Sequence, residues 1–263
     1  MKIFALSDLH LSHATPGKAM DRFGPHWADH PRKIERAWRE RVREEDVVVV
    51  AGDLSWAMRL PEALPDLEFL GRLPGRKVLV RGNHDYWWSS PSKVRAVLPE
   101  GVFILQNDAL RIGGAAFAGT RLWTDPGMAP LRLPLRPRPG EGEGGRGAAP
   151  GMPSAAAPEA DPERDEKLFR RELQRLELSL SRLPPEADLA LAVVHYPPLS
   201  TDGAPTRAAR LIEGAGVRFC LFGHLHDVAP GGADALFGTR RGVTYLLTSC
   251  DYLEFAPLPV AEL

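Results

Sequence analysis

The chain has 263 residues, of which 44% are hydrophobic, and a formal net charge of -1 at pH 7. This length suits one α/β domain with a substantial core. The near-neutral charge provides no global basic field to attract nucleic acid and no reason to expect a membrane-surface protein. Because the opening residues MKIFALSDLH turn polar at the seventh position and no later run could span a bilayer, we expect a soluble cytoplasmic protein.

Short apolar runs, each followed by turn-forming residues, predict strands buried on both faces. The predicted strands cover residues 2–6, 46–51, 77–80, 101–106, 114–120, 188–194, 217–222 and 243–250. Amphipathic patterns between them predict helices at 32–45, 62–72, 91–98 and 164–182. The alternation of strands and helices indicates an α/β layered fold. Cys220 and Cys250 lie in apolar runs, which is typical of small core residues in a reduced protein.

One segment breaks this alternation. Residues 129–162 are dominated by Pro, Gly, Ala and charged residues and cannot bury a core. We expect an exposed insertion in a single domain of residues 1–263. A loop of this length is either functional, such as a lid, or a tolerated insertion, and we favour the second interpretation.

Five predicted strand ends carry polar side chains of the types that can bind metals. They are Asp8 and His10, Asp53, the run Asn83, His84 and Asp85, then His195, and finally His224 and His226. Ligands of open α/β sheets bind beyond the carboxyl ends of the strands, so these groups should converge there. The mixture of carboxylate, imidazole and amide contains too much nitrogen for a calcium site and suits Mn, Fe, Zn, Ni or Co. The ligands are too many for one ion, but they fit two ions that share a carboxylate.

The ordered series D-x-H, GD, GNHD, H and GHxH resembles the calcineurin-like metallophosphoesterases from Asp8 to His226. The resemblance implies a four-layer α/β/β/α sandwich with two mixed β-sheets around a dinuclear centre. It implies one metal at Asp8, His10 and His226, a second at Asn83, His195 and His224, and Asp53 as the bridge. The expected cofactors are two divalent transition-metal ions, with Mn²⁺ favoured over Fe, Zn, Ni or Co.

The resemblance also assigns a role to His84, which in this family protonates the leaving oxygen or stabilises the transition state. We expect Asp85 to hold the His84 imidazole by a hydrogen bond and to favour its charged form. The alternative for Asp85 is a residue that only stabilises the turn. The implied mechanism is in-line hydrolysis by a metal-activated hydroxide.

Aromatic and basic residues near these blocks are candidates for substrate contacts. They are Trp56, Arg59, Trp87, Arg121 and Tyr196. The rings could form a wall for a planar leaving group such as a nucleobase, and the arginines could hold a phosphate. For Trp87, packing beneath the site is the alternative interpretation.

Two local features narrow the substrate. The third block is GNHD rather than GNHE, and LSWAMR follows Asp53 where protein phosphatases of this superfamily carry DRG. The blocks look more like the bacterial branch that includes cyclic-nucleotide phosphodiesterases. We therefore predict a phosphodiesterase for a small-molecule substrate, with nucleotides or cyclic nucleotides as candidates. The alternatives are a phosphomonoesterase, a nucleotide pyrophosphatase, or a catalytically inactive metal-binding scaffold. A DNA nuclease is disfavoured because the chain has no basic stripe.

Overall fold

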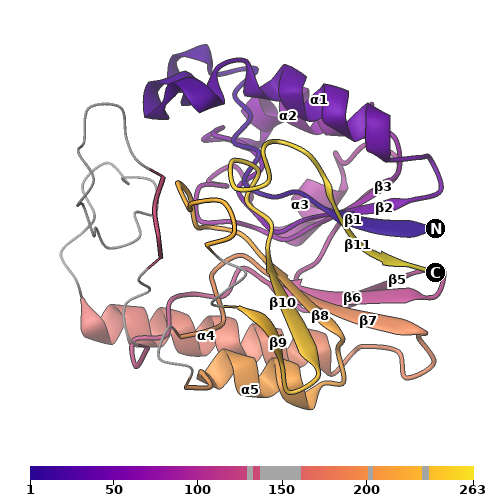
Figure 1. Ribbon diagram of the computed structural model, residues 1–263, viewed down its shortest axis with the longest axis vertical. Helices are drawn as coiled ribbons and strands as arrows, with labels where there is room; N and C mark the ends of the chain where they lie inside the picture. Colours follow the sequence, from indigo (N-terminus) through magenta and orange to yellow (C-terminus); the bar gives the residue numbers. More distant parts are fainter. Residues whose placement is uncertain (129–132, 137–160, 201–203, 233–236) are drawn as a thin grey trace.

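The structure is a computed structural model that describes residues 1–128, 133–136, 161–200, 204–232 and 237–263. Helices form the two outer layers and two β-sheets form the inner layers (Figure 1). The predicted α/β/β/α sandwich with two mixed sheets is confirmed. Most of the predicted insertion at 129–162 lies outside the described residues, so its role stays a prediction.

The first sheet has five strands in the order β11-β1-β2-β3-β4. Its strands are β1 (Lys2–Ala5), β2 (Val47–Val50), β3 (Arg76–Leu79), β4 (Val102–Ile104) and β11 (Leu258–Glu262). Strands β1 to β4 are parallel, and β11 pairs antiparallel with β1. This pairing places the two chain ends side by side (Figure 1), where the backbone N–H of Leu263 donates to the Met1 carbonyl at 3.0 Å.

The second sheet has six strands in the order β5-β6-β7-β8-β10-β9. Its strands are β5 (Ala109–Ile112), β6 (Ala115–Thr120), β7 (Leu189–Val194), β8 (Phe219–Phe222), β10 (Val243–Leu247) and β9 (Gly238–Arg240). The four inner strands are parallel, and the edge strands β5 and β9 are antiparallel to their neighbours. Both sheets therefore present several parallel carboxyl ends on one edge.

Helices cover the outer face of each sheet. The helices on the first sheet are α1 (His30–Arg41), α2 (Leu60–Gly71) and α3 (Pro91–Arg95), and those on the second are α4 (Pro162–Leu180) and α5 (Arg207–Gly214). Short 3₁₀ turns at Pro16–Lys18, Met20–Phe23 and Pro25–Trp27 precede α1. Among the described residues, no helix combines the length and apolar character needed to cross a membrane.

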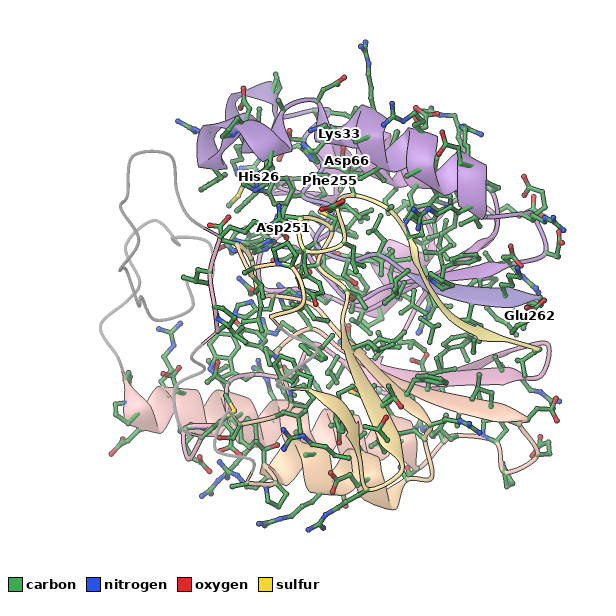
Figure 2. All side chains as sticks on the ribbon, in the orientation of Figure 1. His26, Lys33, Asp66, Asp251, Phe255 and Glu262 are labelled. Atoms are coloured by element: carbon green, nitrogen blue, oxygen red, sulfur yellow. The ribbon has the colours of Figure 1, made fainter. Side chains whose placement is uncertain are left out.

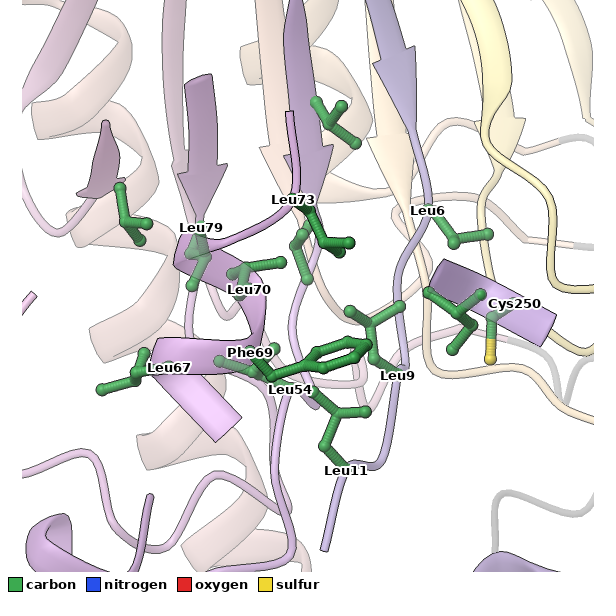
Figure 3. Packing of buried hydrophobic residues seen from close by; sticks show 14 of the residues in the cluster. Leu6, Leu9, Leu11, Leu54, Leu67, Phe69, Leu70, Leu73, Leu79 and Cys250 are labelled. Carbon is green, nitrogen blue, oxygen red and sulfur yellow. The ribbon is translucent and has the colours of Figure 1, made fainter. Parts of the chain in front are cut away.

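Strand residues alternate between two cores because successive side chains point to opposite faces. Val47 and Val49 lie in the core between the sheets, whereas Val48 and Val50 pack toward the helices. Figure 3 shows the helix-side core, where leucines of the first sheet and its loops meet those of α2. Burial on both faces explains why these strands appear in the sequence as continuous apolar runs.

Every predicted strand and helix overlaps an observed element of the same type, with ends that differ by a few residues. The sequence analysis missed the edge strands β5, β9 and β11 and the short helix α5. These three edge strands are partly exposed and mix polar with apolar residues, so they lack a buried-strand pattern, whereas the edge strand β4 is apolar and was predicted. Cys220 and Cys250 are buried and unpaired, as expected of core residues.

Candidate metal centre

The seven predicted ligands converge where the carboxyl ends of the two sheets meet. They follow β1 (Asp8, His10), β2 (Asp53), β3 (Asn83), β7 (His195) and β8 (His224, His226). Parallel strands deliver their carboxyl ends to one edge, and the two sheets face each other, so residues distant in sequence become neighbours.

A first group consists of Asp8, His10 and His226, all of them buried. Nε2 of His226 lies 3.7 Å from Oδ1 of Asp8 and 3.2 Å from Nε2 of His10. Three potential ligand atoms thus point into one small volume. This is the set that the resemblance assigns to the first metal.

A second group surrounds Asn83. Its Oδ1 lies 2.6 Å from Nε2 of His195 and 2.9 Å from Nδ1 of His224. Oδ2 of Asp53 lies 3.5 Å from Nε2 of His195 and 3.8 Å from Nε2 of His10. Asp53 therefore sits between the two groups, where a bridging carboxylate would have to lie. The assignment of each residue to a metal stays a prediction.

The backbone is strained at several of these residues. Asp8, His10, Asp53 and His224 have φ values of 56°, 46°, 53° and 72°, in the left-handed region that side chains other than glycine rarely adopt. Each such residue costs on the order of 1–3 kcal/mol, and strain of this kind clusters at functional sites. The surrounding fold must therefore hold these loops in place.

Two glycines let the loops approach the carboxylates. A Cβ at Gly82 would lie 2.0 Å from Oδ1 of Asp53, and a Cβ at Gly223 would lie 2.2 Å from Oδ2 of Asp8. Neither distance is sterically allowed, so these positions require glycine. The close approach explains the glycine in the GNHD and GHxH blocks.

The electrostatics of the cluster favour a bound cation. Burial raises the pKa of Asp8 to about 7 and that of Asp53 well above its usual range. Burial also lowers the pKa of His10 and of His195 well below the usual value of a histidine. A divalent cation between these groups would stabilise ionised carboxylates and neutral imidazoles, which are the forms that bind metals. The donor set therefore fits two transition-metal ions.

A supporting layer of residues follows β10 and was missed by the sequence analysis. The Nδ1 of His226 lies 2.9 Å from Oδ1 of Asp251, and Ser249 Oγ donates to Oδ2 of Asp8 at 2.9 Å. Burial acts to lower the pKa of His226, but the Asp251 carboxylate opposes it and the pKa is raised to about 9. The sequence did contain a signal for these residues. The polar residues Ser249 and Asp251 lie at the end of a predicted strand, as the five recognised blocks do.

Asp251 also belongs to a third group of potential ligands. It lies near His26 and Asp227, with Nε2 of His26 at 3.7 Å from Oδ1 of Asp227. Figure 2 labels His26 and Asp251 on neighbouring segments at the loop edge of the molecule. The Asp251 carboxylate accepts a hydrogen bond from the Asp227 backbone N–H at 2.8 Å. Because this bond fixes the loop that carries Asp227, it indicates a structural role for Asp251 in this third group.

The expected bond between Asp85 and the His84 imidazole is absent, which corrects the predicted role of Asp85. The Asp85 carboxylate instead accepts five donors: the backbone N–H groups of Asp53, Leu54, Ser55 and Gly82, and the indole of Trp87. Among the described residues, Nδ1 of His84 has no hydrogen-bond partner. Asp85 therefore fastens the loop after β2 to the loop after β3.

His84 itself lies beside the metal ligands. Its backbone N–H donates to Oδ1 of Asp53 at 2.8 Å, and its side chain is 5% exposed. Burial, with the nearby charge of His226, lowers the His84 pKa to about 4. The expected charged form is thus not the resting form near pH 7.

Of the aromatic candidates, Trp56 lies at the site and Trp87 does not. The Trp56 ring stacks on His10, with centroids 4.8 Å apart, and lies 4.4 Å from the His84 ring. Trp87 is 1% exposed and packs in the core, so the interpretation as packing holds and it forms no substrate wall. Tyr86, which the sequence analysis did not select, is 47% exposed and lies 6.1 Å from the His84 ring.

The remaining candidates occupy different places. Tyr196 is buried and packs on His224 at 4.2 Å between ring centroids, so it supports a predicted ligand. The guanidinium of Arg121 is 3.5 Å from Glu172 of α4. Arg59 is exposed at the start of α2, and within the described ranges no contact joins its side chain to the predicted ligands.

Comparisons with known proteins agree with this geometry. Two sequence relatives share parts of the chain: Gene 66 protein of Mycobacterium phage D29, 40% identical over 83 residues, and the uncharacterized protein MJ1445 of Methanocaldococcus jannaschii, 33% identical over 84 residues. Each match spans 32% of this chain, and 40% and 47% of the respective relatives, so the chain matches less than half of each.

Among solved structures, the phosphopantetheinyl hydrolase of Mycobacterium tuberculosis superposes with a TM-score of 0.51 over 97% of this chain and 90% of that chain. At 18% identity, this likeness shows the fold alone. The sequence pattern of the calcineurin-like phosphoesterases matches residues 1–228, which include every predicted metal ligand. This chain therefore belongs to the calcineurin-like phosphoesterase family of metal-dependent hydrolases.

Proposed function

We propose that this protein is a phosphodiesterase that hydrolyses small nucleotide-type diesters, cyclic nucleotides included. One observation carries the proposal: the Asp53 carboxylate lies between two groups of potential metal ligands, and His84 and Trp56 lie directly beside them. A site for two metals, a proton donor and an aromatic surface are thus adjacent. The partner we expect is a small-molecule phosphoester.

Asp8, His10 and His226 would hold one divalent transition-metal ion, and Asn83, His195 and His224 the other, with Asp53 shared. When bound, such ions lower the pKa of a nucleophilic water and neutralise charge on the phosphoryl group, and Mn²⁺ is our first choice. The protein's own contribution is to hold the ligands in strained, preorganised loops and to supply a proton donor.

His84 is placed to stabilise the leaving oxygen. With a pKa lowered to about 4 by burial, its imidazole is neutral near pH 7 and retains one N–H donor. An anionic phosphoester beside the ring would favour the protonated form, so His84 can gain a proton on substrate binding and pass it to the leaving oxygen. Because Asp85 does not contact the ring, the substrate itself must favour this charged form.

The aromatic surface supports a planar leaving group. Trp56 is half-buried between His10 and His84, and Tyr86 exposes nearly half of its surface beside His84. Exposed aromatic rings next to a hydrolytic centre suit the stacking of a nucleobase. We also propose a cytoplasmic location, which the unpaired buried thiols of Cys220 and Cys250 support.

The first experiment compares hydrolysis of bis(p-nitrophenyl) phosphate and p-nitrophenyl phosphate by metal-stripped protein resupplied with Mn²⁺. We expect Mn²⁺-dependent cleavage that favours the diester, and a loss of about 10²–10⁴-fold in kcat for His84→Ala, the range typical of a lost general acid. Lys167→Met, at an exposed residue of α4, is the matched control and should leave the rates unchanged.

Each other outcome selects an alternative. A clear preference for the monoester would replace the proposal with a phosphomonoesterase or a nucleotide pyrophosphatase. No turnover of either compound by protein with two bound metals would favour the inactive scaffold.

A further inference from the structure

A second set of charged groups surrounds a small cavity beside the metal centre. The cavity lies where the carboxyl ends of β3, β4 and β6 meet α4, and has a volume of about 30 Å³. Its charged lining consists of four arginines and one acid: Arg81, Arg121, Arg171, Arg175 and Glu172. We refer to these five residues as the arginine pocket. Its volume is too small for a nucleobase, and its guanidinium donors suit the oxygen atoms of a phosphate or carboxylate.

Glu172 cannot balance this charge. Its Oε1 is approached by Arg175 at 2.7 Å, Arg171 at 3.3 Å and Arg121 at 3.5 Å. Its Oε2 accepts a hydrogen bond from Thr120 at 3.0 Å. One buried carboxylate therefore faces three guanidinium groups, with a fourth in the same lining.

Arg81 is that fourth group, and the carboxylates of Asp85 and Glu172 act on it only from beyond ion-pair distance. Its Nε is buried without a hydrogen-bond partner, and in the part of the chain that the structure describes no acceptor pairs with its guanidinium. A partly buried, unpaired cation beside other cations is unfavourable unless an anion compensates it. Planar guanidinium groups are also the donors best matched to the oxygens of a phosphate.

We propose that the arginine pocket binds a phosphate group on the part of the substrate that is not transferred. Arg81 precedes the predicted ligand Asn83 by two residues, and the backbone carbonyl of Arg121 accepts the N–H of His195 at 3.1 Å. The pocket is thus linked to two predicted ligands of the second metal, to Asn83 along the chain and to His195 by a backbone hydrogen bond. The assignment of the phosphate to the substrate rests on the proposed function, whereas the binding of an anion does not.

The anion site is tested first without metals, where hydrolysis plays no part. Binding of inorganic phosphate to metal-stripped protein is measured by calorimetry for the unmodified chain and for Arg81→Met, Arg175→Met and Glu172→Gln. We expect each arginine variant to weaken binding by about tenfold or more, as expected for the loss of a charge-assisted hydrogen bond. Glu172→Gln should strengthen binding, because it removes the only competing negative charge of the lining.

The opposite effects of these variants separate a specific site from misfolding. Arg39→Met, which removes an exposed arginine paired with Glu35 on α1, should leave phosphate binding unchanged. Circular dichroism is used to check that each variant is folded. Absence of phosphate binding, or equal binding by all variants, would overturn the proposal.

The source of the phosphate is then tested with active protein. The KM of a diester that carries a second phosphate is compared with that of bis(p-nitrophenyl) phosphate, which carries none. If the pocket holds a substrate phosphate, Arg81→Met raises the first KM by about tenfold and leaves the second unchanged. If both KM values stay unchanged while the variant loses phosphate binding, the pocket binds free phosphate and its assignment to the substrate is wrong. An inactive protein that still binds phosphate would overturn the proposed function alone.

Discussion

At the scale of single residues, the site depends on side chains that hold its predicted ligands. Asp251 is fully buried, faces Nδ1 of His226, and leaves Nε2 directed at Asp8 and His10. Carboxylate partners of this kind fix the orientation of a metal-binding histidine and increase its basicity. Asp85 plays a related part for the backbone, since it accepts N–H groups from two loops at once.

We therefore expect Asp251→Asn to weaken Mn²⁺ binding by about 10–100-fold, because the amide can neither stabilise the imidazole charge nor enforce its orientation as the carboxylate does. Titration of metal-stripped protein by calorimetry measures the effect. Asp29→Asn at the exposed start of α1 is the matched control. A dissociation constant within a factor of two of the unmodified protein would show that Asp251 has no positioning role.

At the scale of elements, β3 contains a lysine whose side chain is buried. The Lys77 side chain is 2% exposed, and its Nζ donates to the Leu73 carbonyl at the end of α2. Burial lowers the pKa of Lys77 to about 8. The folded state therefore binds fewer protons than the unfolded state between pH 8 and the ordinary value of 10.5.

The sign of the resulting pH dependence follows. Where the unfolded state binds more protons, the free energy of unfolding rises with pH. Comparing the unmodified protein with Lys77→Met in urea, we expect the difference in unfolding free energy to shift toward the unmodified protein by about 2–3 kcal/mol from pH 8 to pH 10.5. Lys167→Met should show no such trend, and a flat difference for Lys77→Met would contradict the lowered pKa.

At the scale of the whole molecule, the metal centre joins the two sheets. Asp8, Asp53 and Asn83 come from the first sheet, and His195, His224 and His226 come from the second. A cation held by both sets would bind the folded state only, because the ligands are dispersed in the unfolded chain. Metal binding should therefore stabilise the entire domain and not one loop.

Accordingly, Mn²⁺ at a hundred times its dissociation constant should raise the free energy of unfolding by about 2.7 kcal/mol for each site that it fills. For a domain of this size that corresponds to an increase in Tm of roughly 5–10 °C, in a single transition. Differential scanning calorimetry with and without chelator tests this. The double variant Asp8→Asn, His226→Asn, which keeps the second predicted ligand set, should show a smaller increase in Tm, and equal Tm values for the metal-free and Mn²⁺-loaded unmodified protein would count against the centre.

The inner strands, the main helices and the order of the candidate ligands could be predicted from the amino-acid sequence alone. The strands could be predicted because burial on both faces leaves a continuous apolar run. The ligands could be predicted because each follows such a run within a few residues. Three of the four edge strands, β5, β9 and β11, carry no such signal, since their residues are partly exposed and mix polar with apolar side chains.

Which side chains from distant segments face one another became apparent only in the folded structure. The sequence places Asp85 next to His84, yet the five donors of Asp85 come largely from the loop after β2, about 30 residues earlier, and turn its carboxylate away from the imidazole. Asp251 likewise lies beside His226, and Arg81 lines the same cavity as the arginines of α4, because the fold brings together segments that are far apart in the chain. Hydrogen bonds and charges act over a few ångströms in space, and local sequence patterns do not specify those distances between segments far apart in the chain.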